Sequence, residues 1–187
     1  QFLERYYGHL DDGEEFDYVN FRRLHRHIKE RLPKYRSFFE QVATRYQLDW
    51  RLLAAIGYEE SQWNPTAVSA TGVRGLMMLT KSTAQEMGVT NRDDPEESIE
   101  GGAKYFLGIK SRLSTQIPEP DRTWFALAAY NVGLGHLKDA FQLTTDYGDN
   151  PNRWVDVKEY LAKLSDEDWH RQTQYGYARG YEPVKFV

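Results

Sequence analysis

Apolar side chains recur every three or four residues along most of the chain, which is the spacing of one face of an α-helix. The first such group is Phe21, Leu24 and Ile28, and similar groups follow down to the C-terminal region. Strand-like alternation is confined to residues 66–79, where a short hairpin is possible. The pattern predicts a mainly α protein.

Residues that favour helix ends divide this pattern into separate helices. Asn, Asp and Thr side chains accept hydrogen bonds from free N–H groups at a helix start, and glycine often ends a helix. The expected starts are Asn20, Pro33, Asp49, Thr80, Asp94 and Pro120, and the expected ends include Gly88, residue 113 and Gly133. Further helices are expected over 135–143, 153–163 and the C-terminal region.

The first nineteen residues differ from the rest. Phe2, Leu3, Tyr6 and Tyr7 are apolar, and the stretch 11–15 that follows is acidic and contains glycine, as in a solvated linker. We interpret residues 1–19 as a linker that follows an upstream domain, and residues 20–187 as one folded domain.

Composition narrows the classes of function. The net charge is -4, which argues against a nucleic-acid binder because such proteins carry a basic excess. The chain has no cysteine and no apolar run long enough to span a membrane. His25 and His27 lie two residues apart on a predicted helix, face different sides, and form no metal site.

The helix predicted after Asp49 carries an acid on its apolar side. Angles around the helix axis are counted from Leu52 at about 100° per residue. The apolar face of Leu52, Leu53 and Ile56 is then centred near 45°. Glu60 lies at about 80°, close to this face, whereas Glu59 lies at about 340°. Apolar surroundings and the negative end of the helix dipole both raise a carboxyl pKa. A carboxyl that stays protonated near neutral pH is suited to general acid catalysis.

Four short motifs occur in order from Glu60 onward, and the first begins on this helix. They are Glu60-Ser61-Gln62-Trp63-Asn64-Pro65, Gly72-Val73-Arg74-Gly75-Leu76-Met77-Met78, Ala128-Ala129-Tyr130-Asn131-Val132-Gly133 and Gly180-Tyr181-Glu182-Pro183-Val184. Together they resemble the motifs of family 1 lytic transglycosylases, relatives of goose-type lysozyme, over residues 35–187.

This resemblance implies a lysozyme-like helical fold and cleavage of peptidoglycan glycan strands without hydrolysis. It implies that Glu60 is the general acid and then the base, with no metal and no cofactor. The substrate-binding residues that it implies are Ser61, Met78, Tyr130, Asn131 and Tyr181.

One position departs from the family. The second motif usually ends in Gln, and Met78 stands there instead, which removes an amide that would contact sugar. The variant resembles the branch of the family in which a solute-binding-protein-like regulatory domain precedes the catalytic domain. That resemblance implies a periplasmic protein, associated with the outer membrane through parts outside this chain.

Two alternatives stay open at this point. A hydrolytic muramidase would share the fold but needs a second carboxylate to position water, for which Asp93, Asp94 and Glu100 are candidates. A non-catalytic peptidoglycan-binding module would keep the binding residues and lack activity. The departure at Met78 favours such a module slightly, and the presence of Glu60 argues against it.

Overall fold

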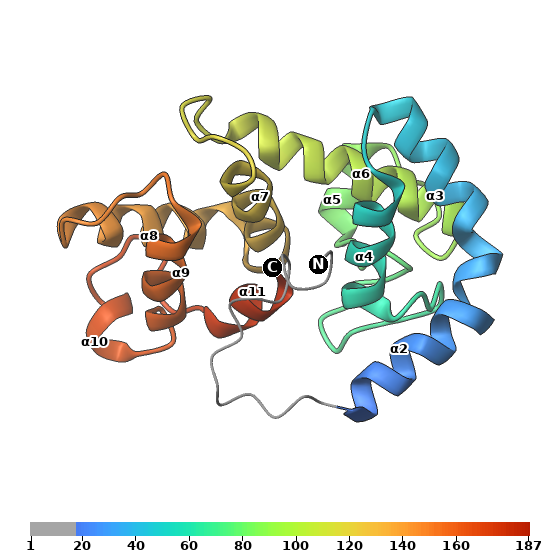
Figure 1. Ribbon diagram of the computed structural model, residues 1–187, viewed down its shortest axis with the longest axis horizontal. Coiled ribbons are helices and arrows are strands. Elements are labelled where there is room, and N and C mark those ends of the chain that lie inside the picture. The colour runs from blue at the N-terminus through green and yellow to red at the C-terminus, as the bar shows by residue number, and fades with distance from the viewer. Residues whose placement is uncertain (1–17) are drawn as a thin grey trace, which may run out of the picture. The chain divides into compact units, whose positions relative to one another are not determined.

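The computed structural model describes residues 18–187, and almost all of its regular structure is α-helical (Figure 1). The helices are α2 (Tyr18–Glu30), α3 (Leu32–Tyr46), α4 (Trp50–Ser61), α5 (Lys81–Met87), α6 (Pro95–Arg112), α7 (Asp121–Val132), α8 (Leu134–Asp146), α9 (Trp154–Lys163), α10 (Glu167–His170) and α11 (Tyr181–Phe186). In place of the expected hairpin, two isolated bridges pair Arg74 with Val68 and with Leu79. The mainly α prediction is confirmed.

Most predicted helix boundaries are also confirmed. The side chains of Asp49, Thr80 and Asp94 each accept a hydrogen bond from a backbone N–H in the first turn of α4, α5 and α6. Gly88 ends α5 with a left-handed backbone. The start at Asn20 is wrong, because α2 already begins at Tyr18. A cap is worth only about 1 kcal/mol, so it does not exclude two more helical residues before it.

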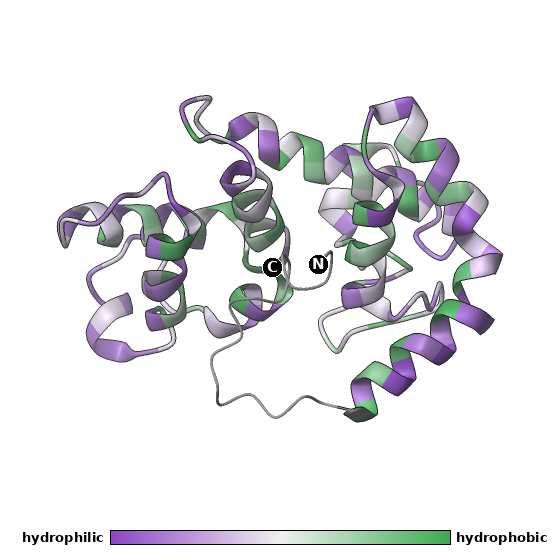
Figure 2. Ribbon diagram, in the orientation of Figure 1, coloured by the Kyte–Doolittle hydropathy of each residue, from purple (hydrophilic) through white to green (hydrophobic). Residues whose placement is uncertain are grey.

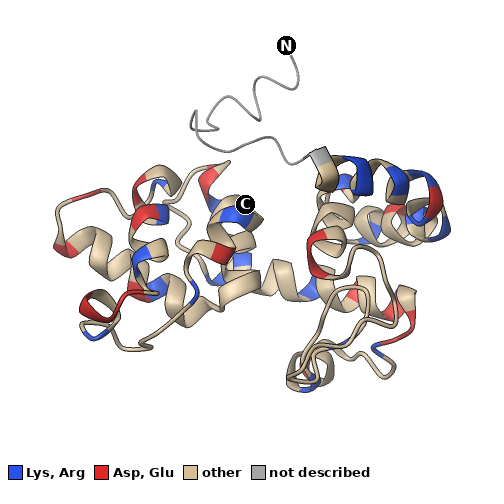
Figure 3. Ribbon diagram, turned by 90° about the horizontal axis from the view of Figure 1, so that it is seen from below, with Lys and Arg blue, Asp and Glu red and all other residues tan. Residues whose placement is uncertain are grey.

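The chain divides into two compact units, one ending at Lys34 and one running from Tyr35 to Val187. In the first unit, α2 carries four Lys or Arg residues and one Glu, although the whole chain is acidic (Figure 3). The predicted linker lies almost wholly in residues 1–17, outside the described residues. The boundary between residues 19 and 20 therefore stays a prediction.

The core of the second unit surrounds α7, which packs against α6, α8, α9 and α11. The middle of α7, residues 125–129, is apolar and buried (Figure 2). Phe125 on α7 is fully buried, and its ring meets Phe141 at 4.9 Å and Trp154 at 5.8 Å in edge-on geometry. Burying each such side chain contributes about 1.5–3 kcal/mol. These contacts hold α7 in a fixed position within the second unit.

Helix α11 is held on α9 by a close approach of two backbones. A β-carbon built on Gly180 would lie 1.5 Å from the carbonyl oxygen of Leu161, so only glycine fits there. Two residues earlier, Ala178 N–H donates to the Leu164 carbonyl at 3.2 Å. These contacts fix the position at which Tyr181 begins α11.

The loop before α5 turns sharply at Gly75. Its φ is +88°, and a β-carbon there would lie 1.9 Å from the carbonyl oxygen of Arg92. Its N–H donates to the Ala67 carbonyl at 3.0 Å. Gly75 is thus required both by its backbone angle and by the space available.

We predict that Gly75→Ala lowers the free energy of unfolding by about 3 kcal/mol, because it adds a steric clash to a strained backbone angle. The matched control is Gly72→Ala, since Gly72 has a φ of +80° and open space around it. That variant should lose only about 1 kcal/mol. Urea unfolding of both variants measures the difference, and equal losses would show that Arg92 moves aside.

Candidate active site

Helix α4 stops one residue after Glu60. Gln62 and Trp63 both adopt left-handed backbone angles, with φ of 54° and 56°, and the Trp63 N–H reaches back to the Gly57 carbonyl at 3.4 Å. The Trp63 ring is buried, and its Nε1–H donates to the Ala54 carbonyl at 2.8 Å. Burial of this ring and its hydrogen bond offset the cost of two left-handed non-glycine residues.

Ser61 ties the end of α4 to the loop at 72–79. Its hydroxyl lies 2.8 Å from the Leu76 carbonyl and 3.1 Å from the Gly57 carbonyl, and it accepts a bond from Asn64 N–H. Among the described residues it forms no hydrogen bond with the Glu60 carboxyl. The Ser61 hydroxyl therefore joins the backbone at the end of α4 to the backbone of the loop.

The peptide groups of Met77 anchor this loop to two helices. The Met77 N–H donates to Ser98 Oγ on α6 at 3.1 Å, and the Met77 carbonyl accepts from the Tyr130 hydroxyl on α7 at 3.0 Å. Met77, Ser98 and Tyr130 are all buried. A hydrogen bond in such a setting is costly to leave unmade, so the loop is held firmly beside α4.

Glu60 is half-buried and Glu59 is exposed, as the helix phase predicts. Burial and, to a smaller extent, the neighbouring charge of Glu59 together raise the pKa of Glu60 to about 8. The carboxyl is therefore mostly protonated at neutral pH. This is the only described acid whose pKa is raised so far.

Two tyrosines lie near this carboxyl. Burial raises the pKa of Tyr130 well above its ordinary value, and the charges of Glu60 and Tyr105 add to the effect. The ring centroids of Tyr105 and Tyr130 are 5.1 Å apart. Tyr130 is thus within electrostatic reach of the acid, but its hydroxyl is bonded to the Met77 carbonyl.

Tyr105 and Ser98 were not predicted from the sequence. They lie seven residues apart on α6, so both face the same side of the helix. Ser98, Gly101 and Gly102 are small residues at spacings of three and four, and a β-carbon on Gly102 would collide with the Met77 side chain. This row of small residues is the signal that another segment approaches α6 closely.

The remaining predicted residues are more exposed. Asn131 lies at the end of α7 and is exposed. Tyr181 is 48% exposed and forms no hydrogen bond with Glu60 among residues 18–187. Met78 is half-buried with a φ of 48°. Helix α11 nevertheless reaches the site through Phe186, whose ring stacks on Tyr130 at 6.5 Å.

The three candidates for a second carboxylate are engaged elsewhere. Asp93 pairs with Arg74 at 3.1 Å, and Asp94 caps α6. Glu100 accepts from the Tyr46 hydroxyl at 2.8 Å and pairs with Lys104 at 3.0 Å. None of them contributes to the pKa of Glu60, and Glu59 is the only charged group within residues 18–187 that does.

Residues 18–187 contain neither a cluster of metal-binding side chains nor a membrane-spanning helix. That part of the chain holds no group of three or more His, Asp or Glu side chains arranged to bind a metal ion. None of its helices is both long enough and apolar enough to cross a membrane.

The chain belongs to the family of the transglycosylase SLT domain, whose sequence profile matches residues 37–152. That range contains Glu60 at the end of α4, the loop at 72–79 and α7. The family predicted from the four motifs is confirmed.

Curated relatives carry a more specific name, membrane-bound lytic murein transglycosylase F. The protein of that name from Marinobacter nauticus is 57% identical over all 187 residues of the chain. Those from Pseudomonas putida strain GB-1 and Pseudomonas syringae pv. tomato are 60% and 57% identical over 98% of the chain. The chain spans about 37% of the length of the first two relatives.

The raised pKa predicts that replacing the acid stabilises the fold. Above its ordinary pKa of 4.5, the carboxyl ionises in the unfolded chain, whereas in the folded protein it keeps its proton until about pH 8. The wild-type protein therefore loses stability, relative to Glu60→Gln, as the pH rises through this interval. We expect the free energy of unfolding of Glu60→Gln to exceed that of the wild type by about 1–3 kcal/mol at pH 8. At pH 4 the two free energies should be equal.

Urea unfolding at both pH values measures this effect, and Glu59→Gln is the matched control. Burial also raises the pKa of Glu59, but by less because Glu59 is more exposed, so its replacement should change stability less. If Glu60→Gln is less stable than the wild type at pH 8, the carboxyl is ionised and paired in the fold.

Proposed function

We propose that this domain is a lytic transglycosylase that cleaves the β-1,4 bond between N-acetylmuramic acid and N-acetylglucosamine in peptidoglycan. The observation that supports it is the half-buried Glu60, with a pKa of about 8, at the end of a helix in a member of this family. The relatives carry the same activity in their names. We propose the same activity for the whole protein.

In the proposed reaction, Glu60 gives its proton to the bridging oxygen as the bond from that oxygen to the muramic acid C1 breaks. The resulting carboxylate then takes the proton of the muramic acid C6 hydroxyl while O6 attacks C1. The product carries a 1,6-anhydro ring, no water is consumed, and Glu60 ends protonated again. One carboxyl with a pKa near neutral suits both steps.

A hydrolytic muramidase is the alternative, and the contacts favour it less. Glycosidases that use water commonly position it with a second carboxylate across the cleaved bond. Asp93, Asp94 and Glu100 are each engaged in other contacts, and Glu59 is the only charged group in the described part of the chain that influences the pKa of Glu60. A binding module without activity does not account for an acid whose burial destabilises the ionised form.

We propose that some of the other predicted residues contact the substrate and that others position the loop. Asn131 and Tyr181 are exposed and present polar groups to the glycan, and Met78 offers an apolar wall for a sugar face. Ser61 and Tyr130 are positioning residues, because their hydroxyls hold the backbone of the loop.

We further propose the setting that the resemblance implies. The domain acts on glycan strands in the periplasm and is associated with the outer membrane through parts outside this chain. The relatives are described as membrane-bound and are longer than this chain, which agrees with such an arrangement. A solute-binding-protein-like domain upstream would regulate the catalytic domain.

The proposal predicts that purified peptidoglycan is converted to 1,6-anhydromuropeptides, measured by mass spectrometry of the soluble products. Glu60→Gln should reduce the rate at least a hundredfold, because an amide of the same shape has no proton to give. Products that end only in reducing muramic acid would assign the domain to the muramidases.

Glu59→Gln is the matched control for that loss. It should stay active, and its kcat/KM should begin to fall at a lower pH than in the wild type, because the charge that raises the pKa of Glu60 is gone. Loss of activity in Glu59→Gln with retention in Glu60→Gln would reverse the assignment of the acid.

A further inference from the structure

Arg92, in the segment that precedes α6, joins the two ends of the loop at 72–79. Its Nη1 atom donates a hydrogen bond to the Gly72 carbonyl at 3.0 Å and another to the Leu79 carbonyl at 2.9 Å. Hydrogen bonds from a charged donor are about twice as strong as those between neutral groups. The half-buried side chain of Arg92 therefore closes the loop at its base.

The backbone around Arg92 is itself fixed on α6. The N–H groups of Thr90 and Asn91 donate to the Glu97 carboxylate at 2.7 Å and 2.9 Å. These bonds, that from Asn91 most of all, lower the pKa of Glu97, so the carboxylate stays ionised at neutral pH. The N–H of Asp93 also donates to the Asn91 side chain at 3.1 Å. The first turn of α6 thus holds Arg92 in place.

A second side-chain link joins the same segment to the loop. Arg74 in the loop pairs with Asp93 at 3.1 Å, and the two side chains are 44% and 38% exposed. An ion pair with that much exposure contributes little. The bonds from Arg92 to the two carbonyls are therefore the stronger of the two links.

The loop covers the face of α4 that carries the acid. A β-carbon on Gly57 would lie 2.8 Å from the Leu76 side chain and 3.2 Å from the Met77 sulfur, so both side chains pack on α4 at that point. Glu60 is three residues later, only about 60° around the helix from Gly57. The Ser61 hydroxyl joins the same turn to the Leu76 carbonyl at 2.8 Å.

We propose that Arg92 is a positioning residue for the reaction: by holding both ends of the loop, it keeps the loop packed against α4 and shields the Glu60 carboxyl from water. Arg92 touches no reacting atom in the proposed reaction. Its effect on turnover rests on the proposed function, whereas its effect on the carboxyl depends only on the contacts of the loop.

Loss of Arg92 should act through water and not through charge. Without the guanidinium, the carbonyls of Gly72 and Leu79 lose their donor, and the two ends of the loop are free to separate. Water that reaches Glu60 stabilises the ionised carboxylate and lowers its pKa. Removal of a positive charge would by itself raise a carboxyl pKa. The direction of the change therefore separates the two effects.

The test is a carbon-13 NMR titration of the Glu60 carboxyl in Arg92→Ala and in the wild-type protein. We expect the midpoint to fall by about one pH unit in the variant, because the carboxylate regains part of its hydration. Arg92→Lys should bring the midpoint back to the wild-type value, since one ammonium group can donate to both carbonyls.

Turnover of peptidoglycan gives a second readout. In Arg92→Ala the fall of kcat/KM at high pH should begin about one pH unit lower, which is about a fivefold loss at pH 8 and little loss at pH 6. A variant that is only less folded would lose the same fraction of its activity at both pH values.

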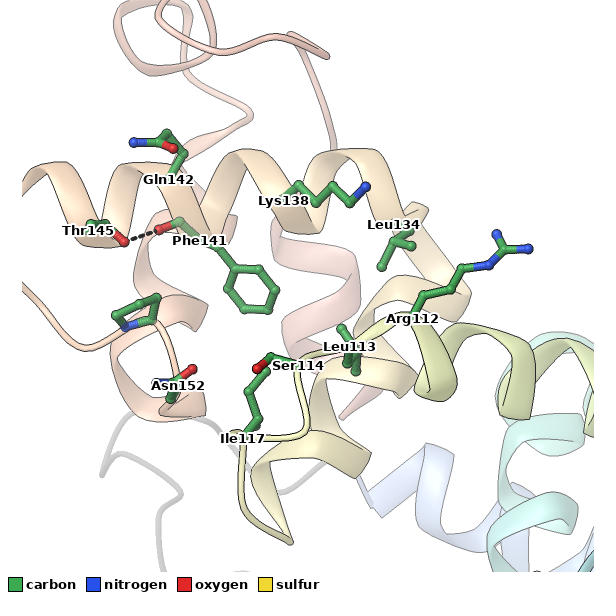
Figure 4. Close-up of a pocket in the computed structure, with 11 residues that line it drawn as sticks. Arg112, Leu113, Ser114, Ile117, Leu134, Lys138, Phe141, Gln142, Thr145 and Asn152 are labelled. Carbon is green, nitrogen blue, oxygen red and sulfur yellow. Dashed lines mark hydrogen bonds between the residues drawn. The ribbon is translucent and has the colours of Figure 1, made fainter.

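Arg122→Ala is the matched control. Arg122 is also half-buried, and its Nη2 atom donates to the Lys110 carbonyl at 3.1 Å. Lys110 lies two residues before Arg112, which lines a cavity of about 330 Å³ at the C-terminal end of α6 (Figure 4). No residue of α4 or of the loop lines that cavity. The control therefore breaks a similar bond at the other end of α6 and should leave the Glu60 midpoint unchanged.

A folded Arg92→Ala whose Glu60 midpoint is unchanged or higher overturns the proposal, and so does an equal fall in Arg122→Ala. If Arg92→Ala does not fold, Arg92→Gln takes its place with the same expected fall, because it shortens the side chain and removes the charge but keeps a polar group. A wild-type protein that releases no 1,6-anhydro product contradicts the proposed function instead, and the titration still tests Arg92.

Discussion

Burial of one carboxyl at a helix end is the constraint on which this site depends. Water that would stabilise an ionised Glu60 is largely excluded, and this exclusion raises its pKa to about 8. The protein must then keep α4, the loop and α7 closely packed without offering the acid a cationic partner. The left-handed turn at Gln62 and Trp63 contributes to this packing. It ends α4, and the Trp63 ring packs back on the helix, where its Nε1–H donates to the Ala54 carbonyl.

The loop beside the acid is held through backbone atoms. Both peptide groups of Met77 are bonded, one to Ser98 and one to Tyr130, and Ser61 bonds the carbonyl of Leu76. Because these bonds use main-chain atoms, the side chain at the next position is free to differ. This accounts for Met78 in place of the family's usual Gln without a change in the framework around the acid.

The sequence predicts features that depend on local spacing and misses those that depend on distant contacts. The caps at Asp49, Thr80 and Asp94 and the burial of Glu60 relative to Glu59 follow from a few neighbouring residues. Tyr105 and Ser98 lie near the site only because α6 packs against the loop at Met77. No local pattern in the sequence specifies that contact. Asn131 is exposed because α7 ends at the next residue, where the helical face no longer predicts burial.

The most direct measurement of the central claim is a carbon-13 NMR titration of the Glu60 side-chain carboxyl, assigned by comparison with Glu60→Gln. The account predicts one carboxyl that titrates near pH 8 and disappears in the variant. A Glu60 carboxyl that titrates near its ordinary value of 4.5 would contradict it, because the group would be ionised at neutral pH and unable to give a proton to the glycosidic oxygen.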